Sequence, residues 1–146
     1  MSQRGKMKEG KIGRIIFSRI FEDEDLLEGI KKRAEESNVK AGLLFLIGSL
    51  KEAYLGFYEE GEYKRIEVKK PLEIASCIGN VSMKENGELI IHAHMVVSDR
   101  SGNSYGGHLL KGCKVAATAE LMLIEALEVD LKRKFEDKYK LYLLDT

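Results

Sequence analysis

The sequence predicts an α+β fold built on a mainly antiparallel β-sheet, with two helices packed on it. Segments rich in β-branched and aromatic residues outnumber segments with helical spacing, and several connections between them are hairpin-short. A chain of 146 residues, 44% of them apolar, suits one domain with a buried core. We therefore expect residues 1–11 to form a flexible basic arm and residues 12–146 to form a single domain.

The elements follow from changes of pattern along the chain. A first strand is expected over residues 12–21, where β-branched and aromatic residues dominate. The acidic run at residues 22–25 precedes apolar residues at helical spacing, and acidic groups in a first turn complement the helix dipole, so a helix should begin there. The remaining strand candidates are residues 41–47, 51–58, 63–70, 72–78, 89–98, 105–110 and 140–144.

Residues 115–129 are interpreted as the second helix. This segment is apolar at almost every position and offers hardly any polar face. We therefore expect it to be largely buried, with part of its covering supplied by another subunit.

The charge balance limits the case for nucleic-acid binding. The chain carries 24 Lys and Arg against 24 Asp and Glu, so the net charge gives no general attraction to phosphates. Residues 1–20, however, hold six basic residues against one acidic residue. In an oligomer this arm would be repeated as a basic rim, so phosphate contacts are expected from Arg4, Lys6, Lys8, Lys11 and Arg14.

Two features indicate a cytoplasmic protein without membrane association. Residues 1–14 lack the apolar stretch of a secretory signal, and the longest apolar run, residues 43–47, is too short to span a bilayer. The two cysteines, Cys77 and Cys113, are far apart and form no CxxC pair, which favours reduced thiols over a disulfide or a zinc ribbon.

All three histidines of the chain lie in one short window. His92 and His94 share one face of a predicted strand, while apolar residues occupy the other face, which should be the core side. The segment Asp99–Asn103 resembles a hairpin turn whose three-residue loop ends at Gly102, and this length places His94 directly opposite His108. A one-residue change of register would move His108 to the other face.

Three imidazoles that converge from two strands match a zinc site with an open fourth position, and nickel, copper or iron are acceptable substitutes. The alternative is that they are polar residues making ordinary hydrogen bonds on an exposed or interfacial face. Glu73 and Glu88 are candidate carboxylates, although nothing in the sequence places either beside the histidines. Gly106 and Gly107 indicate either a bulge or close backbone contact, or an anion-binding loop. No nucleotide-binding or serine-nucleophile motif is present, so hydrolysis would have to use the metal.

Several short motifs occur in a characteristic order: Ile47–Leu50, Leu72–Asn80, His92–His94 with Ser98–Asp99, and Gly106–Leu109 followed by Gly112. In this order the chain resembles the plant and prokaryote conserved (PPC) domain in its stand-alone prokaryotic form, over about residues 10–145. The resemblance implies an antiparallel-sheet homotrimer. It also implies that His92, His94 and His108 match histidines associated with a metal, usually zinc, in prokaryotic members.

The resemblance implies less about DNA. The residues Leu72, Glu73 and Ile74 align with a motif tied to interactions between proteins in plant members. Plant members also carry separate AT-hooks for the minor groove, whereas Gln3–Met7 lacks the second arginine and the proline of such a hook. DNA binding is therefore an expectation from kinship.

Three hypotheses follow from these observations. The first is a non-enzymatic, metal-binding homotrimer of this family with a DNA-binding or regulatory role. The second is a small metal-dependent hydrolase that uses metal-bound water, with Glu73 as a base. The third is a structural trimer with the metal at or near the subunit interface.

Overall fold

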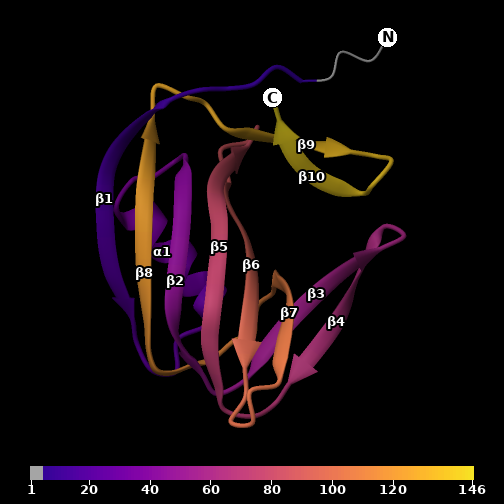
Figure 1. Cartoon of the computed structure of the whole chain (residues 1–146). Coiled ribbons are helices and arrows are strands. Elements are labelled where there is room, and N and C mark those ends of the chain that lie inside the picture. Colours follow the sequence, from indigo (N-terminus) through magenta and orange to yellow (C-terminus); the bar gives the residue numbers. More distant parts are fainter. Residues whose placement is uncertain (1–4) are drawn as a thin grey trace.

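The computed structural model describes residues 5–146 and confirms the mainly antiparallel sheet. The elements are β1 (Lys11–Ile20), α1 (Leu26–Glu36), β2 (Gly42–Leu50), β3 (Ala53–Glu59), β4 (Glu62–Val68), β5 (Leu72–Lys84), β6 (Leu89–Ser98), β7 (Ser104–Leu109), β8 (Val115–Leu127), β9 (Lys132–Glu136) and β10 (Leu141–Asp145). The strand order is β1-β8-β2-β5-β6-β7-β3-β4, and the β9–β10 hairpin joins the end of β5 (Figure 1).

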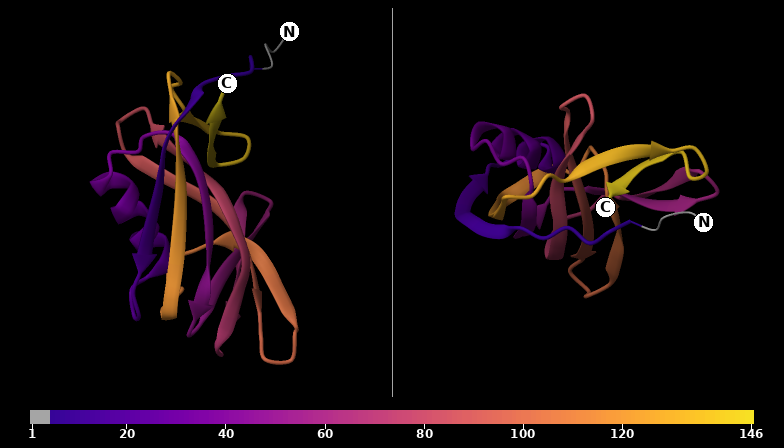
Figure 2. Two further views of the ribbon diagram at one scale, coloured as in Figure 1. Left: turned by 60° about the vertical axis from the view of Figure 1, so that its left-hand side comes forward. Right: turned by 90° about the horizontal axis from the view of Figure 1, so that it is seen from above.

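The helix covers one face of the curved sheet, behind β8 and β2 in Figure 1 and at the side of the molecule in Figure 2. It begins after Asp25, whose carboxylate accepts a hydrogen bond from the backbone N–H of Glu28, as expected of an N-cap. Its buried side includes Leu26, Ile30 and Ala34, and the helix contacts β1, β6 and β8. The core therefore lies between α1 and this inner face of the sheet, and the helix predicted after the acidic run is confirmed.

The second predicted helix is wrong, because Val115–Leu127 forms strand β8, paired with β1 on one side and β2 on the other. Leu121 and Leu123 are buried on the inner face, while Met122 and Ile124 lie on the outer face and are also apolar. Apolar residues on both faces remove the polar alternation that identifies a strand, and short apolar runs of this kind are ambiguous by periodicity. Residues 5–146 thus contain one helix.

Strands β2 and β5 are longer than predicted, and a further strand, β9, was not predicted. The expected break at Gly48 is a change of register within β2, where a Cβ on Gly48 would lie 2.3 Å from the carbonyl oxygen of Thr118. Strand β5 continues past Asn80 to Lys84. Strand β9 forms in the charged segment after β8, for which the sequence pattern predicts no element.

Both cysteines are buried free thiols, as predicted. Burial raises the pKa of Cys77 to about 12 and that of Cys113 to about 11. Within residues 5–146 no helix has the length and apolar character needed to cross a membrane.

Candidate metal centre

The turn between β6 and β7 has the predicted three-residue loop. The backbone N–H of Asp99 donates to the carbonyl of Asn103 at 2.9 Å. One carboxylate oxygen of Asp99 accepts the backbone N–H groups of Ser101 and Asn103, each at 2.9 Å. Gly102 ends the loop with φ of 82°, a conformation that glycine adopts without a steric penalty. This turn fixes the register of the two strands.

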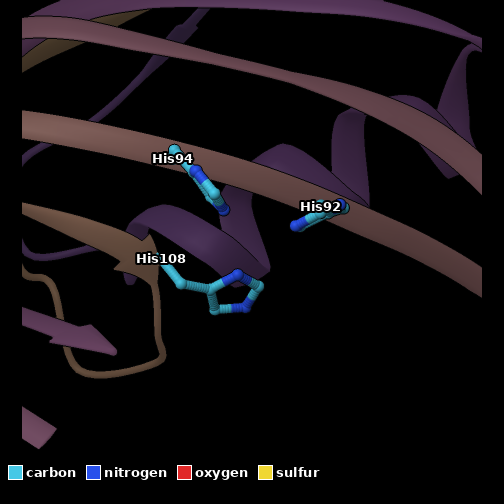
Figure 3. Close-up of side chains that lie close together, drawn as sticks. All are labelled: His92, His94 and His108. Carbon is cyan, nitrogen blue, oxygen red and sulfur yellow. The ribbon is translucent and has the colours of Figure 1, made fainter. Parts of the chain in front are cut away.

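The register places His94 directly opposite His108, as predicted. Figure 3 shows His92 and His94 on β6 and His108 on β7, with the three rings turned toward a common space. One ring nitrogen from each histidine lies within 4.8 Å of the others. Within residues 5–146 this group contains the three histidines and no carboxylate.

His108 is half-buried beneath a tyrosine. Its ring stacks on Tyr63 of β4 with 4.7 Å between centroids. Its Nδ1 atom is buried and has no hydrogen-bond partner among the described residues. The pKa of His108 is lowered to about 4, mainly by burial. The nearby charges of His92, His94 and Arg133 make smaller contributions in the same direction. A metal ion requires a neutral imidazole, and a buried nitrogen without a partner in the chain is compatible with that role.

A buried arginine from the C-terminal hairpin completes the surroundings of His92. Arg133 of β9 is 4% exposed, and its Nε donates to Ser82 Oγ at 2.7 Å. Nη1 donates to the carbonyl of Tyr142 at 3.2 Å, and Nη2 donates to Asn80 Oδ1 at 2.9 Å. Nη2 also lies 3.3 Å from Nδ1 of His92, which must be the acceptor because a guanidinium has no acceptor atom. Burial, with a further contribution from Arg133, lowers the pKa of His92.

Sequence reasoning missed Arg133. It is one of 24 basic residues in the chain, and no motif surrounds it. Its burial arises because β9 pairs in parallel with the last residues of β5, which brings the guanidinium between Asn80 and Ser82. No local pattern in the sequence signals this long-range docking.

The three histidines fit a divalent transition metal. Metal–nitrogen bonds of about 2.0–2.1 Å in a tetrahedron separate the ligand nitrogens by about 3.3 Å, so binding would draw the rings inward. Zinc suits this cluster, because it consists of three imidazoles and, among the described residues, no carboxylate. The unpaired Nδ1 of His108 is consistent with the same metal, and a fourth position would be left for a non-protein ligand.

The histidines belong to a row of side chains that crosses the outer face of the sheet. Directly paired residues share a face, and the pairing runs without interruption through six strands. The row is Phe17–Met122–Phe45–Ile78–His94–His108. The candidate metal centre thus lies at one end of an apolar band, on the face opposite α1.

The two candidate carboxylates lie elsewhere. Glu73 pairs with Ser98 at the start of β5, about 15 Å along the strand from the Ile78–His94 pair. Glu88 forms ion pairs with Lys31 and Lys84 beside the helix. Neither residue belongs to the histidine cluster.

The other family-motif residues have structural positions. Leu72 and Ile74 are buried in the core, whereas Glu73 is exposed. Gly106 and Gly107 pair regularly with β6, without a bulge. A Cβ on Gly107 would lie 2.8 Å from the carbonyl oxygen of Gly56, so this glycine allows β3 to approach β7 closely. The close-contact interpretation of the glycine pair therefore fits, and the phosphate-loop interpretation does not.

The basic residues predicted to contact nucleic acid lie in or just before β1 in the sequence. Arg4 lies outside the described residues, and Lys6 is exposed. Lys8 donates to the carbonyl of Asp130 at 2.7 Å, and Lys11 lies 3.3 Å from a carboxylate oxygen of Glu128. Arg14 donates to both carboxylate oxygens of Glu125 and to the carbonyl of Ser37. The last three basic residues of this set thus already have partners within the chain.

Comparison with solved structures gives close matches over nearly the whole chain. A metal-containing protein from Archaeoglobus fulgidus matches with a TM-score of 0.88 and 30% identity, covering 97% of this chain and 99% of that one. A PPC protein from Pyrococcus horikoshii matches with a TM-score of 0.85 and 34% identity, covering 96% of this chain and 95% of that one. A candidate DNA-binding protein from Bacteroides thetaiotaomicron shares the fold, with a TM-score of 0.82, 21% identity and coverage of 96% and 98%.

Sequence comparison gives the same family. A curated relative, the bifunctional protein GlmU of Synechococcus sp. (strain JA-3-3Ab), is 31% identical over 122 residues. The match covers 83% of this chain and 18% of that protein, so this chain corresponds to a small part of it. The profile of the Plants and Prokaryotes Conserved (PCC) domain matches residues 7–127. The chain therefore belongs to the plant and prokaryote conserved domain family.

Proposed function

We propose that this protein is a homotrimeric, metal-binding member of the family with a DNA-binding or regulatory role, and that it is not an enzyme. The observation that carries the proposal is the histidine cluster, in which one nitrogen from each of His92, His94 and His108 lies within 4.8 Å of the others. The metal would be zinc or another divalent transition metal. The Archaeoglobus protein, which is called metal-containing and is 30% identical, supports this assignment.

The apolar outer face supports the homotrimer. Phe17 is 73% exposed, Ile47 51% and Ile78 52%, and these side chains lie on one continuous face. An apolar groove of about 390 Å³ lies between Phe17, Ile47 and Met122. A soluble chain rarely leaves so large an apolar surface uncovered, and the occupant we infer is a second copy of this chain.

The regulatory or DNA-associated role depends most on kinship. The Bacteroides neighbour is called a candidate DNA-binding protein, but at 21% identity it supports the fold more than the role. In this chain Lys8, Lys11 and Arg14 have intramolecular partners at exposed positions, and exposed ion pairs are weak enough for phosphates to displace. A trimer would present three copies of this arm.

DNA binding can be tested with a salt series. Full-length protein and a variant lacking residues 1–10 should be titrated with duplex DNA from low to physiological salt. The proposal expects the full-length chain to bind and to show the steeper salt dependence, because the arm would release counterions. Equal slopes for the two proteins, or no binding near physiological salt, would remove the DNA role.

A metal-dependent enzyme is the second candidate, favoured by one observation. A pocket of about 190 Å³ adjoins His92 and His108, and the described cluster supplies three protein ligands, which leaves a position for water. Metal-bound water is a nucleophile at neutral pH. Glu73 is too far away to serve as its base. The third candidate, a structural trimer with the metal near the interface, is favoured by the apolar row that ends at His94 and His108.

Metal content tests the proposal directly. Protein purified without a His-tag or added metal should contain about one divalent ion per chain by elemental analysis. The variants His94→Ala and His108→Ala should lose it, while the control Glu73→Gln should retain it. Equal metal content in wild type and both histidine variants, or none in any of them, would overturn the metal site.

A further inference from the structure

We propose that the pocket between the histidine cluster and the C-terminal hairpin binds a small organic carboxylate, held between Arg133 and a metal on the histidines. This inference rests on the proposed metal site and adds a ligand to it. The pocket has a volume of about 190 Å³ and is bounded by β6, β7, β4 and the β9–β10 hairpin.

Arg133 is a buried charge without a counterion among the described residues. Arg133 is 4% exposed, and within residues 5–146 none of its side-chain hydrogen bonds goes to a carboxylate. Its described hydrogen bonds go to the neutral acceptors Ser82, Asn80, the Tyr142 carbonyl and His92. A buried charge normally has a partner of opposite sign, and an arginine fork recognises carboxylates with particular geometric fit. An anionic ligand would supply the missing charge.

The partners of Arg133 within the chain do not use all of its N–H groups. A guanidinium has five N–H groups, and the contacts of Arg133 use four of them, which leaves one on Nη1. Nδ1 of His92 faces Nη2, so the ring would ligate a metal through Nε2. Such a ring carries its proton on Nδ1, and the hydrogen bond from Arg133 would then be lost. Metal binding would therefore leave one free N–H on each terminal nitrogen, which is the pair that a carboxylate uses.

The lining of the pocket selects the class of anion. Besides His92, His108 and Arg133, the walls are mainly apolar or aromatic and include Tyr63, Leu141, Tyr142 and Leu143. A fully hydrated inorganic anion would gain little from these walls. A small carboxylate with an apolar body would place its charge at Arg133 and the metal and bury its body against the hairpin.

Because the metal and Arg133 would both act on the same anion, the two binding events should be coupled. Metal-loaded protein should bind the carboxylate about tenfold or more tightly than metal-free protein, since a hydrogen-bonded charge contact contributes about this much. Binding of the carboxylate should strengthen metal binding by the same factor.

The experiment uses cobalt(II) as the metal and benzoate as the probe, with the neutral isostere benzamide as the ligand control. Cobalt-loaded full-length protein is titrated with each compound at constant ionic strength. The visible spectrum reports on the metal, and calorimetry reports on affinity. Arg133→Gln is compared with Arg100→Gln, a control at an exposed position of the β6–β7 loop. Benzoate should alter the cobalt spectrum saturably, benzamide should not, and Arg133→Gln should weaken benzoate binding about tenfold or more while retaining cobalt.

The outcomes separate this inference from the proposed function. Failure of the wild type to bind cobalt would contradict the metal site and this inference together. Full cobalt loading with equal responses to benzoate and benzamide would overturn the carboxylate site alone. The comparison of benzoate with benzamide in the wild type tests the carboxylate site even if Arg133→Gln disturbs the hairpin. Wild-type benzoate affinity in a folded Arg133→Gln variant would also overturn the site.

Discussion

His94 and His108 lie directly opposite each other on β6 and β7, and this pair brings the three histidines of the chain together. The alternation of apolar residues decides that His92 and His94 face away from the core, and the three-residue loop closed by Asp99 and Asn103 decides that His108 joins them. The candidate metal centre is thus a consequence of strand register.

Gly107 should tolerate a side chain less well than its neighbour Gly106. A Cβ at Gly107 would lie 2.8 Å from the carbonyl oxygen of Gly56, whereas a Cβ at Gly106 meets nothing closer than 3.4 Å. Gly107→Ala should therefore push β3 from β7 and lower the free energy of unfolding by about 1–3 kcal/mol. Gly106→Ala should change it by less than about 0.5 kcal/mol. Urea denaturation measures both, and equal midpoints would contradict the packing described for this edge.

The trimer should depend on the outer apolar face. Phe17→Glu places a charge at the β1 end of that face, and burying an unpaired carboxylate in an interface is strongly unfavourable. Light scattering should give the mass of three chains for the wild type and of one chain for the variant. Phe57→Glu is the matched control, because Phe57 is 59% exposed on β3 and points to the opposite face from Gly56, the residue paired with His108. A trimeric Phe17→Glu variant would show that another surface forms the assembly.

Stability of the metal-free protein should fall as the pH drops from about 6.5 toward 4. The folded-state pKa of His108 is about 4 because burial disfavours its charged form, whereas the ordinary pKa of a histidine is 6.5. Between these values the unfolded state binds more protons, so protonation favours unfolding in this window and has no such effect above it. Urea midpoints at pH 7 and pH 5 in the presence of a chelator measure the effect.

The variant His108→Phe keeps a ring against Tyr63 without a titrating group and should show a weaker dependence over the same range. The carboxyls of Asp99 and Glu125 have pKa values of about 2 in the fold against ordinary values of 3.8 and 4.5, so their contribution to stability is lost only as the pH falls below about 4.5 and changes little between pH 7 and pH 5. The same slope in both proteins would show that His108 does not cause the effect.

The β9–β10 hairpin should be held to the sheet chiefly by Arg133. Its backbone pairs with β5 at two positions only, Met83 with Lys132 and Lys84 with Arg133. In Arg133→Gln the amides of residues 132–145 should exchange with deuterium about tenfold faster or more, while those of β5 and β6 stay protected. Unchanged exchange in the hairpin would mean that the strand pairing suffices without the guanidinium.

Much of the sheet and the histidine cluster could be predicted from the sequence, because both depend on short-range patterns. Alternation and turn residues are local, and they place β6, the loop and His108 correctly. The same reasoning failed for Val115–Leu127, since this central strand is apolar on both faces and rich in good helix formers; its pairing with β1 and β2 overrides that propensity. Arg133 could not be found at all, because its place beside His92 depends on how a C-terminal hairpin docks on a distant strand.

X-ray absorption of the zinc-loaded protein at the zinc edge tests the central claim most directly, because it counts the ligands around the metal. The predicted result is a zinc ion bound by three imidazole nitrogens, from His92, His94 and His108, and by one non-protein light atom. Fewer than three imidazoles per zinc would contradict it, and two would indicate that His92 remains bound to Arg133 instead of the metal.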